Sequence, residues 1–328
     1  MLQRNKKYEV VIVGQFTLDD VVSSELPTRI DSPGGDGLYS LAGVYLWRRG
    51  NTGLVIRLGE DFDIDVIKKI VDDSVDFSGV VNIPGVPNIH IWNMFDRYGH
   101  RYFINQRWGG QDEDMAPRPE DIPEEYIDDS LGIHIAPFPI EWSIPMIESM
   151  PLNGTSDLIV QVDPHFDGIF KKNFGIWKKL LKRIDIFQPS EVEFMQFFGI
   201  EKQSDVRGYI KYMREVTKMG PRVCCVKLGD RGAISYDRLT GEVFCVPAYD
   251  SQVVDVTGCG DSFCGGFLSS YVSDQDIYNA MVCGAISASF NIEKFGSIHN
   301  FSIDPEIVYD RYKTFSDELE KVDCRIIY

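Results

Sequence analysis

The sequence predicts an α/β fold with a mostly parallel central sheet. Short runs rich in β-branched residues alternate with stretches of helical period, and strands that alternate with helices form right-handed β-α-β units. The first run, Tyr8–Gly14 (YEVVIVG), is almost entirely apolar and ends at a glycine, as expected of a strand buried on both faces. The other expected strands are Leu54–Leu58, Gly132–Ala136, Asp157–Val162, Ile184–Phe187 and Arg222–Leu228.

Helical patterns separate many of these strands, and they dominate the chain after Asp261. The expected helices are Gly37–Arg49, Asp63–Asp73, Ile140–Met150, Phe174–Leu181, Glu191–Phe198, Ser204–Met219, Ser262–Tyr271, Gln275–Phe290 and Pro305–Leu319.

Two segments, 15–33 and 88–107, break this alternation. The first has no helical period, and the second has the pattern of two strands around the turn Asp96–Gly99 (DRYG). We expect both to be antiparallel and to form a small sheet that acts as a lid beside the core. Two ordinary edge strands are the alternative. Residues 1–328 are then expected to form a single domain.

Charge limits the class of partner. The chain has 328 residues, with 33 Lys and Arg against 50 Asp and Glu, which gives a formal net charge of −17. This balance argues against binding of nucleic acid, because neutralising a phosphate backbone requires clustered basic side chains. Binding of a small anionic ligand is still possible, because a local group of positive charges can outweigh the negative electrostatic field of the whole protein.

Cysteine usage and hydropathy predict a cytoplasmic protein that does not enter a membrane. The 7 cysteines are odd in number and form no CxxC pair, which is typical of reduced thiols. The apolar run behind the N-terminus, Val10–Val13, is too short for a signal sequence. No stretch approaches the roughly 20 apolar residues that a membrane helix needs.

The strongest local signal is a glycine turn directly before an expected helix, in the segment Val254–Leu268 (VDVTGCGDSFCGGFL). Glycines let backbone N–H groups converge on one point, and the helix adds its partial positive charge, so the segment suits a phosphate group. Asp261 at its rim is suited to take a proton from an attacking hydroxyl. A plain helix start with an aspartate cap is the alternative.

The motif DVTGCGD (Asp255–Asp261) resembles the D-T-x-G-A-G-D signature of the ribokinase-like, or PfkB, family of carbohydrate kinases. The resemblance implies a three-layer α/β/α fold with a β-sheet lid, and ATP and Mg²⁺ as cofactors. It also implies that Asp261 is the catalytic base and that Gly258, Cys259 and Gly260 form the anion hole. Cys259 stands where the family usually has alanine.

Two further motifs resemble the family's substrate-binding segments. Asp19 ends the segment GQFTLD, which is similar to a strand end in the family whose aspartate binds substrate hydroxyls. Asp20 is the alternative candidate for this role. Gly34 and Gly35 match a Gly-Gly motif that contacts the sugar and acts as a hinge. Tyr39 stands where the family usually has asparagine, so a bulky phenol replaces a planar amide.

Two motifs resemble the nucleotide side of the family's site. In QPSEVE, Glu193 matches the glutamate that organises Mg²⁺ and phosphate through water, and Ser190 replaces an asparagine. In VKLGDRGA, Gly229 and Gly232 match a T-x-G-x-x-G segment beside the nucleotide. Lys227 replaces the threonine there; it is expected either to reach a nucleotide phosphate or to be a solvated strand residue.

Two weaker expectations complete the site. The segment 163–165 (Asp-Pro-His) follows a strand where the family often has Asp-Pro-Asn, which favours a place facing the substrate. A monovalent cation near Asp255 and Thr257 is also expected.

The sequence therefore predicts an ATP-dependent kinase that transfers the γ-phosphoryl group to a hydroxyl of a sugar or sugar-like substrate. A nucleoside kinase of the same family and a non-catalytic sugar- or nucleotide-binding regulatory protein are the alternatives. A homodimer formed through the lid is a further expectation, because a lid can present an exposed sheet face.

Overall fold

A large central sheet organises the molecule. The computed structural model describes residues 6–23, 27–47, 50–95, 101–109, 112–320 and 325–327. Its strands are β1 (Tyr8–Val13), β4 (Thr52–Gly59), β5 (Val75–Ile83), β8 (Ser130–Ile135), β9 (Ile159–Val162), β10 (Ile186–Phe187), β11 (Val223–Lys227), β12 (Ala233–Asp237), β13 (Glu242–Val246) and β14 (Arg325–Ile327). They form a 10-stranded sheet in the order β14-β13-β12-β11-β10-β9-β8-β1-β4-β5.

The strands from β11 to β5 in this order all run parallel, and β12, β13 and β14 continue the sheet in antiparallel fashion. This confirms the α/β class with a mostly parallel sheet. Every strand expected from the sequence is present. Strands β5, β12, β13 and β14 were not expected; β5 lies at a sheet edge, where its half-exposed face interrupts the apolar run.

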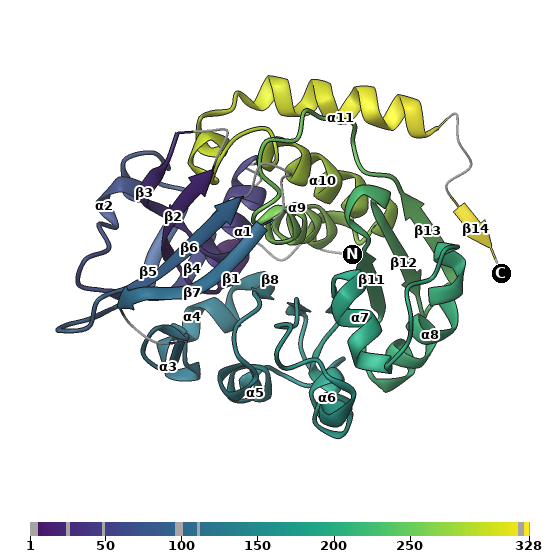
Figure 1. Cartoon of the computed structure of the whole chain (residues 1–328). Helices are drawn as coiled ribbons and strands as arrows, with labels where there is room; N and C mark the ends of the chain where they lie inside the picture. Colours follow the sequence, from purple (N-terminus) through teal and green to yellow (C-terminus); the bar gives the residue numbers. More distant parts are fainter. Residues whose placement is uncertain are drawn as a thin grey trace.

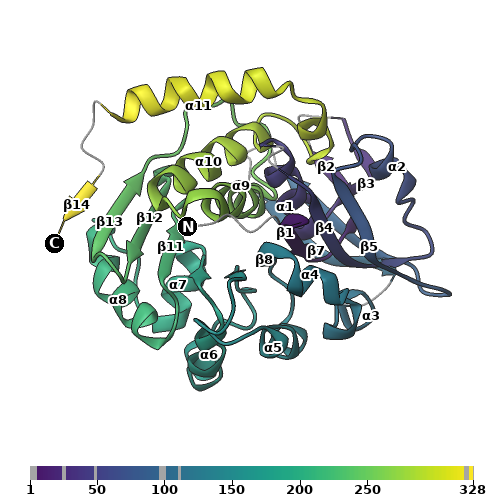
Figure 2. The same ribbon diagram turned by 180° about the vertical axis from the view of Figure 1, so that it is seen from behind.

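Helices cover both faces of the sheet (Figures 1 and 2). Helices α1 (Asp36–Tyr45), α9 (Cys259–Asp274), α10 (Ile277–Asn291) and α11 (Pro305–Leu319) lie on one face. Helices α5 (Ile140–Ser149), α6 (Phe174–Leu180), α7 (Glu191–Phe198) and α8 (Ile210–Met219) lie on the other. Short helices α2 (Asp65–Lys68), α3 (Asp112–Met115) and α4 (Glu124–Asp128) stand in the connections.

The helix expected over residues 63–73 is much shorter than the pattern suggested, since α2 has only 4 residues. Among the described residues, no helix is long and apolar enough to cross a membrane.

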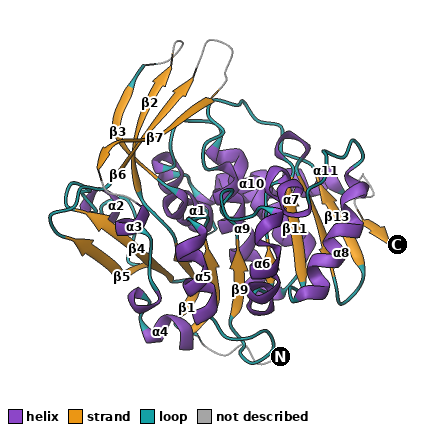
Figure 3. Ribbon diagram, turned by 60° about the horizontal axis from the view of Figure 1, so that its bottom comes forward, coloured by secondary structure: helices purple, strands orange, loops and turns teal. Residues whose placement is uncertain are grey.

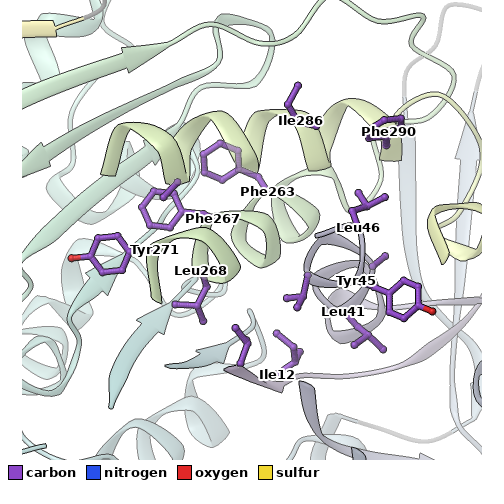
Figure 4. Close-up of a cluster of buried hydrophobic side chains, with 14 of the residues drawn as sticks. Ile12, Leu41, Tyr45, Leu46, Phe263, Phe267, Leu268, Tyr271, Ile286 and Phe290 are labelled. Carbon is purple, nitrogen blue, oxygen red and sulfur yellow. The ribbon is translucent and has the colours of Figure 1, made fainter. Parts of the chain in front are cut away.

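The hydrophobic core beneath α9 fixes the position of the glycine turn. Phe263 and Phe267 of α9 pack with Leu41 of α1 and Ile12 of β1 in one buried cluster (Figure 4). Helices α1 and α9 approach closely at Gly265, where an added methyl group would overlap a backbone carbonyl oxygen of α1. The first turns of both helices are therefore held side by side at one end of the sheet.

A second, 4-stranded sheet projects beside the central one (Figure 3). Its strands are β3 (Arg29–Gly34), β2 (Thr17–Ser23), β6 (Ile89–Phe95) and β7 (Arg101–Gly109), in the order β3-β2-β6-β7. The two segments thus form a sheet of their own, and the alternative of two edge strands is wrong. Residues 24–26 and 96–100, which include the expected DRYG turn, lie outside the described residues.

The pairing inside this sheet corrects one expectation. Strands β2 and β3 pair antiparallel, as do β6 and β7, but β2 and β6 run parallel, with Thr17 opposite Ile89. Strand β2 directly follows β1, and β6 directly follows β5. Because β1 and β5 are parallel strands of the central sheet, the chain leaves the core in the same direction at both places. A purely antiparallel lid is therefore wrong.

Candidate active site

A cavity of about 220 Å³ lies between the second sheet and the first turns of α1 and α9. It brings together residues that are far apart in the sequence. Its walls are formed by Gln15, Thr17, Asp19, Gly35, Asp36, Tyr39, Ile89, Ile91, Asn93, Pro137, His165, Phe166, Asp167, Thr257, Gly258 and Asp261. Five of the eight acceptor-side and catalytic residues that the sequence singled out therefore share one cavity: Asp19, Gly35, Tyr39, Gly258 and Asp261. The other three, Gly34, Cys259 and Gly260, lie next to these residues in the chain or in space but do not line the cavity.

The glycine turn opens helix α9 at the wall of this cavity. Gly258 precedes the helix with a φ of 70°, a left-handed conformation that favours glycine. A methyl group on Gly258 would overlap the ring of Tyr39, so the absence of a side chain also makes room for the phenol. Asp261 lies in the first turn of α9. Backbone N–H groups at such a helix start bind anions.

Asp19 lies on β2 with its carboxylate held in place. It is 6% exposed and accepts hydrogen bonds from the Thr17 hydroxyl (2.6 Å) and from the Asn93 amide (3.2 Å). Gly34 on the neighbouring strand lies against it, and a methyl group there would overlap the carboxylate.

Asp20 does not line this cavity, because successive strand residues point to opposite faces. Its carboxylate instead accepts hydrogen bonds from the Trp92 indole N–H (2.7 Å) and from the backbone N–H of Asp31 (2.9 Å).

Glu193 and Ser190 form a capping box at the start of α7. The backbone N–H of Ser190 donates to Glu193 Oε2 (2.6 Å), and the backbone N–H of Glu193 donates to the Ser190 hydroxyl (3.3 Å). Burial and the nearby Asp163 carboxylate raise the pKa of Glu193 to about 7. One half-buried carboxylate fits a Mg²⁺ ion that keeps most of its water ligands. In the described residues no group of three or more His, Cys, Asp or Glu could hold a metal by itself.

Lys227 is not a solvated strand residue. It ends β11, and its side chain is 11% exposed and forms an ion pair with Asp163. Its Nζ atom lies 3.4 Å from Cys264 Sγ, and a methyl group on Gly260 would lie 3.5 Å from the same Nζ. Burial opposes the charge, but the acidic groups around Lys227, Asp163 first among them, together outweigh it and hold its pKa well above the ordinary value. Lys227 is thus a protonated amine directly beside the glycine turn.

The turn between β11 and β12 carries Gly229 and Gly232. Both glycines have positive φ angles, and Arg231 between them forms an ion pair with Glu191 at the start of α7. The turn does not line the acceptor cavity.

Only part of the segment 163–165 faces the cavity, although the whole segment was expected to face the substrate. His165 lines the cavity, but Asp163 points to Lys227 instead. Sequence reasoning also gave no role to Asp36, Asn93, Phe166 and Asp167, which all line the cavity. Asp36 begins α1 directly after the Gly34-Gly35 motif, which could have pointed to it. Asn93, Phe166 and Asp167 lie in a strand and a loop without a recognisable motif of their own, so only the fold brings them to the site.

A cavity under a small sheet, with a glycine turn and a helix start in its wall, suits an enzyme of the α/β class that transfers a phosphoryl group. The chain belongs to the pfkB family of carbohydrate kinases, whose family model, described as pfkB family carbohydrate kinase, matches residues 10–304.

Two relatives illustrate the range of this family. A cytidine kinase from Thermococcus kodakarensis is 26% identical over 288 residues, which is 88% of this chain and 97% of the relative. A fructokinase-1 from Oryza sativa subsp. japonica is 27% identical over 326 residues, which is 91% of this chain and 96% of the relative. The chain is thus similar to kinases of both nucleosides and sugars.

Solved structures share the fold. Ribokinase from Arabidopsis thaliana, complexed with ribose and ATP, superposes with a TM-score of 0.75 at 21% identity and covers 93% of this chain and 99% of that one. A nucleoside kinase from Methanocaldococcus jannaschii, an archaeal member of the ribokinase family, gives a TM-score of 0.72 at 18% identity, with 94% and 99% coverage. These matches confirm the ribokinase-like three-layer architecture with a lid.

Proposed function

We propose that the protein transfers the γ-phosphoryl group of ATP to a hydroxyl of an uncharged, sugar-like acceptor, with Asp261 as the base. The observation that carries the proposal is that Asp261 and the Gly258 turn face the same cavity as Asp19. One carboxylate is then available to position acceptor hydroxyls, and another to remove a proton from the attacking one. The fold match to ribokinase complexed with ribose and ATP supports the choice of nucleotide.

The residues divide the reaction between them. Asp19 accepts hydrogen bonds from acceptor hydroxyls, and Asp261 takes the proton of the hydroxyl that attacks. That oxygen forms a bond to the γ-phosphorus while the bond to the β–γ bridging oxygen breaks, and ADP leaves with the bond electrons. Backbone N–H groups of Gly258, Cys259 and Gly260 are proposed to bind the charged oxygens of the transferring group, and the Cys259 N–H would give up its long hydrogen bond to the Val256 carbonyl (3.3 Å) to do so.

Ser190, Lys227, Gly229 and Gly232 are proposed to contact the nucleotide. Glu193 would hold Mg²⁺ through water, and the ion would neutralise charge on the phosphates when bound. A structure of a putative ribokinase II from E. coli in complex with ATP and Mg²⁺ has the same fold, with a TM-score of 0.71 at 20% identity.

The cavity walls indicate that the acceptor is uncharged. Four carboxylates, those of Asp19, Asp36, Asp167 and Asp261, line the cavity, and its described lining includes no Lys or Arg. A carboxylate or phosphate on the acceptor would meet this negative field without a cation to balance it, which disfavours sugar acids and sugar phosphates.

A nucleoside is a second candidate, because part of the wall is aromatic. The rings of His165 and Phe166 lie 4.4 Å apart, and Phe166 is 49% exposed at the cavity. An exposed aromatic ring beside a carboxylate suits a ligand that joins a planar base to a ribose. The cytidine kinase of T. kodakarensis is a relative that acts on such a ligand.

An acceptor panel tests the proposal. Purified protein with Mg·ATP is assayed for ADP release with neutral sugars, nucleosides, sugar acids and sugar phosphates. We expect turnover with a neutral sugar or a nucleoside and none with the anionic compounds. Preferred turnover of a sugar acid would contradict the electrostatic reasoning. Tight binding of Mg·ATP without turnover of any acceptor would favour the non-catalytic regulatory alternative.

Two accessory predictions complete the proposal. Asp255 is buried and accepts a hydrogen bond from the Thr257 backbone N–H (2.9 Å), which shapes the loop near which a monovalent cation is proposed. Higher activity in potassium than in choline buffer would support such a cation.

A homodimer formed through the lid is also proposed, and it predicts a mass near twice 37.3 kDa by light scattering.

A further inference from the structure

A buried ion pair lies beneath the proposed phosphate site, and the aspartate of this pair has no role in the mechanism above. Asp163 follows β9 and Lys227 ends β11, so the carboxyl ends of nearby parallel strands bring the two together. Their side chains are 4% and 11% exposed. Removing two charges from water has a large cost, so a pair at this place calls for a physical reason.

The ammonium group is aimed at the glycine turn. Lys227 Nζ contacts the Asp163 carboxylate and Cys264 Sγ, and it lies beside the α-carbon side of Gly260. A lysine ammonium has three N–H donors, of which these two contacts use two. The third donor can reach an oxygen of a phosphate held by the turn, where a fixed positive charge acts strongly because water is excluded.

Other carboxylates compete for the same ammonium group. Glu193 and Asp261 both act on Lys227 electrostatically. A flexible lysine without a fixed partner would turn toward one of them, and either contact would interfere with a proposed role. Asp163 also receives a contact from the Cys264 thiol (3.5 Å), which fixes the carboxylate against α9.

We propose that Asp163 is a positioning residue, which holds the Lys227 ammonium under the Gly258–Gly260 turn, where it contacts the γ-phosphate, and keeps it away from Asp261. The inference rests on the proposed function, because it takes the turn as the γ-phosphate site. It adds a dependence of nucleotide recognition on a residue that touches neither nucleotide nor acceptor.

The test is a double-mutant cycle on nucleotide binding, which needs no knowledge of the acceptor. Calorimetry measures the affinities of Mg·ADP and of a Mg-bound, non-hydrolysable β,γ-imido ATP analogue for the wild type, Asp163→Asn, Lys227→Met and the double variant. We expect Lys227→Met to lower the affinity for the analogue about 10- to 100-fold, as for loss of a charged hydrogen bond, and to lower the affinity for ADP much less. Asp163→Asn should lower the affinity for the analogue about 10-fold, which is a typical effect of a residue that orients a ligand-contacting side chain.

The cycle is decisive because the proposed effect of Asp163 passes through Lys227. In the Lys227→Met background, Asp163→Asn should change the affinity for the analogue by less than about 2-fold. Equal effects of Asp163→Asn in both backgrounds would overturn the proposal, as would equal losses of ADP and analogue. A wild-type protein that binds neither nucleotide would instead contradict the proposed function itself.

A matched control separates positioning from stability. Arg57 and Asp121 form another buried pair, 10% and 5% exposed, and neither residue lines the cavity. Asp121→Asn should lower the melting temperature without changing the ratio of analogue to ADP affinity. The double variant Asp163→Asn/Lys227→Met removes both charges together, which proteins often tolerate, so the cycle stays measurable even if a single variant is unstable.

Discussion

The acceptor side and the phosphate side of the site each hold a buried aspartate, but the two have different partners. Asp19 accepts hydrogen bonds from a neutral hydroxyl and a neutral amide, of Thr17 and Asn93. Asp163 pairs with the ammonium of Lys227. Neutral donors leave the charge of Asp19 in place, so it can accept further bonds from acceptor hydroxyls. Lys227 balances the charge of Asp163, so this carboxylate holds another side chain instead.

The surroundings of the two aspartates also differ in charge. The described wall of the acceptor cavity has four carboxylates and no Lys or Arg, whereas Lys227 lies beside the glycine turn with a pKa held well above its ordinary value by the acidic groups around it. Under the proposed function, this difference would favour a neutral acceptor on one side and an anionic nucleotide on the other. The chain's net charge of −17 is compatible with this proposal, because backbone N–H groups and one buried lysine would supply the local positive field.

The largest expected effect comes from Asp261, at the boundary of the two sides. Asp261→Asn keeps the shape of the side chain but removes the base, so kcat should fall about 10²- to 10⁴-fold. Binding of the ATP analogue should stay within about 3-fold of wild type, since the backbone groups of the turn remain. Steady-state kinetics and calorimetry measure the two quantities. Near-normal turnover would show that the reaction does not take place at this turn.

Asp19 is expected to act on the acceptor alone. Asp19→Asn should lower kcat/KM for the acceptor about 100-fold, because it weakens charged hydrogen bonds to hydroxyls. Asp20→Asn is the matched control, since Asp20 is also buried but does not line the acceptor cavity. Kinetics at saturating ATP should show little change in that control. Similar losses in both variants would indicate a general distortion of β2.

Phe166 distinguishes a nucleoside from a simple sugar. Phe166→Ala should raise KM for a nucleoside about 10-fold, through loss of base stacking, and leave KM for free ribose unchanged. Phe166→Tyr should restore the nucleoside KM, because the ring is what matters. Equal changes in KM for the nucleoside and for ribose would show that Phe166 does not contribute to the choice between these acceptors.

The smallest effect is a pH dependence of stability at His134, which is fully buried on β8. Burial and the charge of Lys227 lower the pKa of His134 to about 3 from an ordinary 6.5. The unfolded chain therefore binds a proton below pH 6.5 that the folded chain does not bind, so stability is lost as pH falls from 6.5 toward 3. Between pH 6.5 and pH 5 this amounts to about 1–2 kcal/mol.

Chemical denaturation of the wild type and His134→Gln at pH 7 and pH 5 checks this value. The variant should lose less stability than the wild type between these two conditions. Equal losses would show that other groups control the acid response.

The sequence was sufficient to predict six strands of the central sheet and the glycine turn, for physical reasons. Parallel strands buried on both faces, such as β1, form continuous apolar runs that stand out from their surroundings. The turn at Gly258 depends on local backbone chemistry, which a short motif contains in full. Edge strands such as β5 are half exposed, and their pattern resembles that of a loop.

The rest of the site could not be predicted because it depends on contacts between distant segments. The parallel pairing of β2 with β6 joins residues about seventy positions apart, and no local pattern contains it. Lys227 looked equally like a solvated residue, since its partner Asp163 lies 64 positions away. The aromatic wall at Phe166 carries no motif at all.

The central claim is that the proposed site has two separate parts, the cavity that binds the acceptor and a phosphate side beside the glycine turn and Lys227. It is tested most directly by measuring, in Asp19→Asn and Lys227→Met, the affinity for the active acceptor and for the β,γ-imido ATP analogue. The account predicts that Asp19→Asn weakens only the acceptor and that Lys227→Met weakens only the analogue. Equal loss of both ligands in both variants would contradict it.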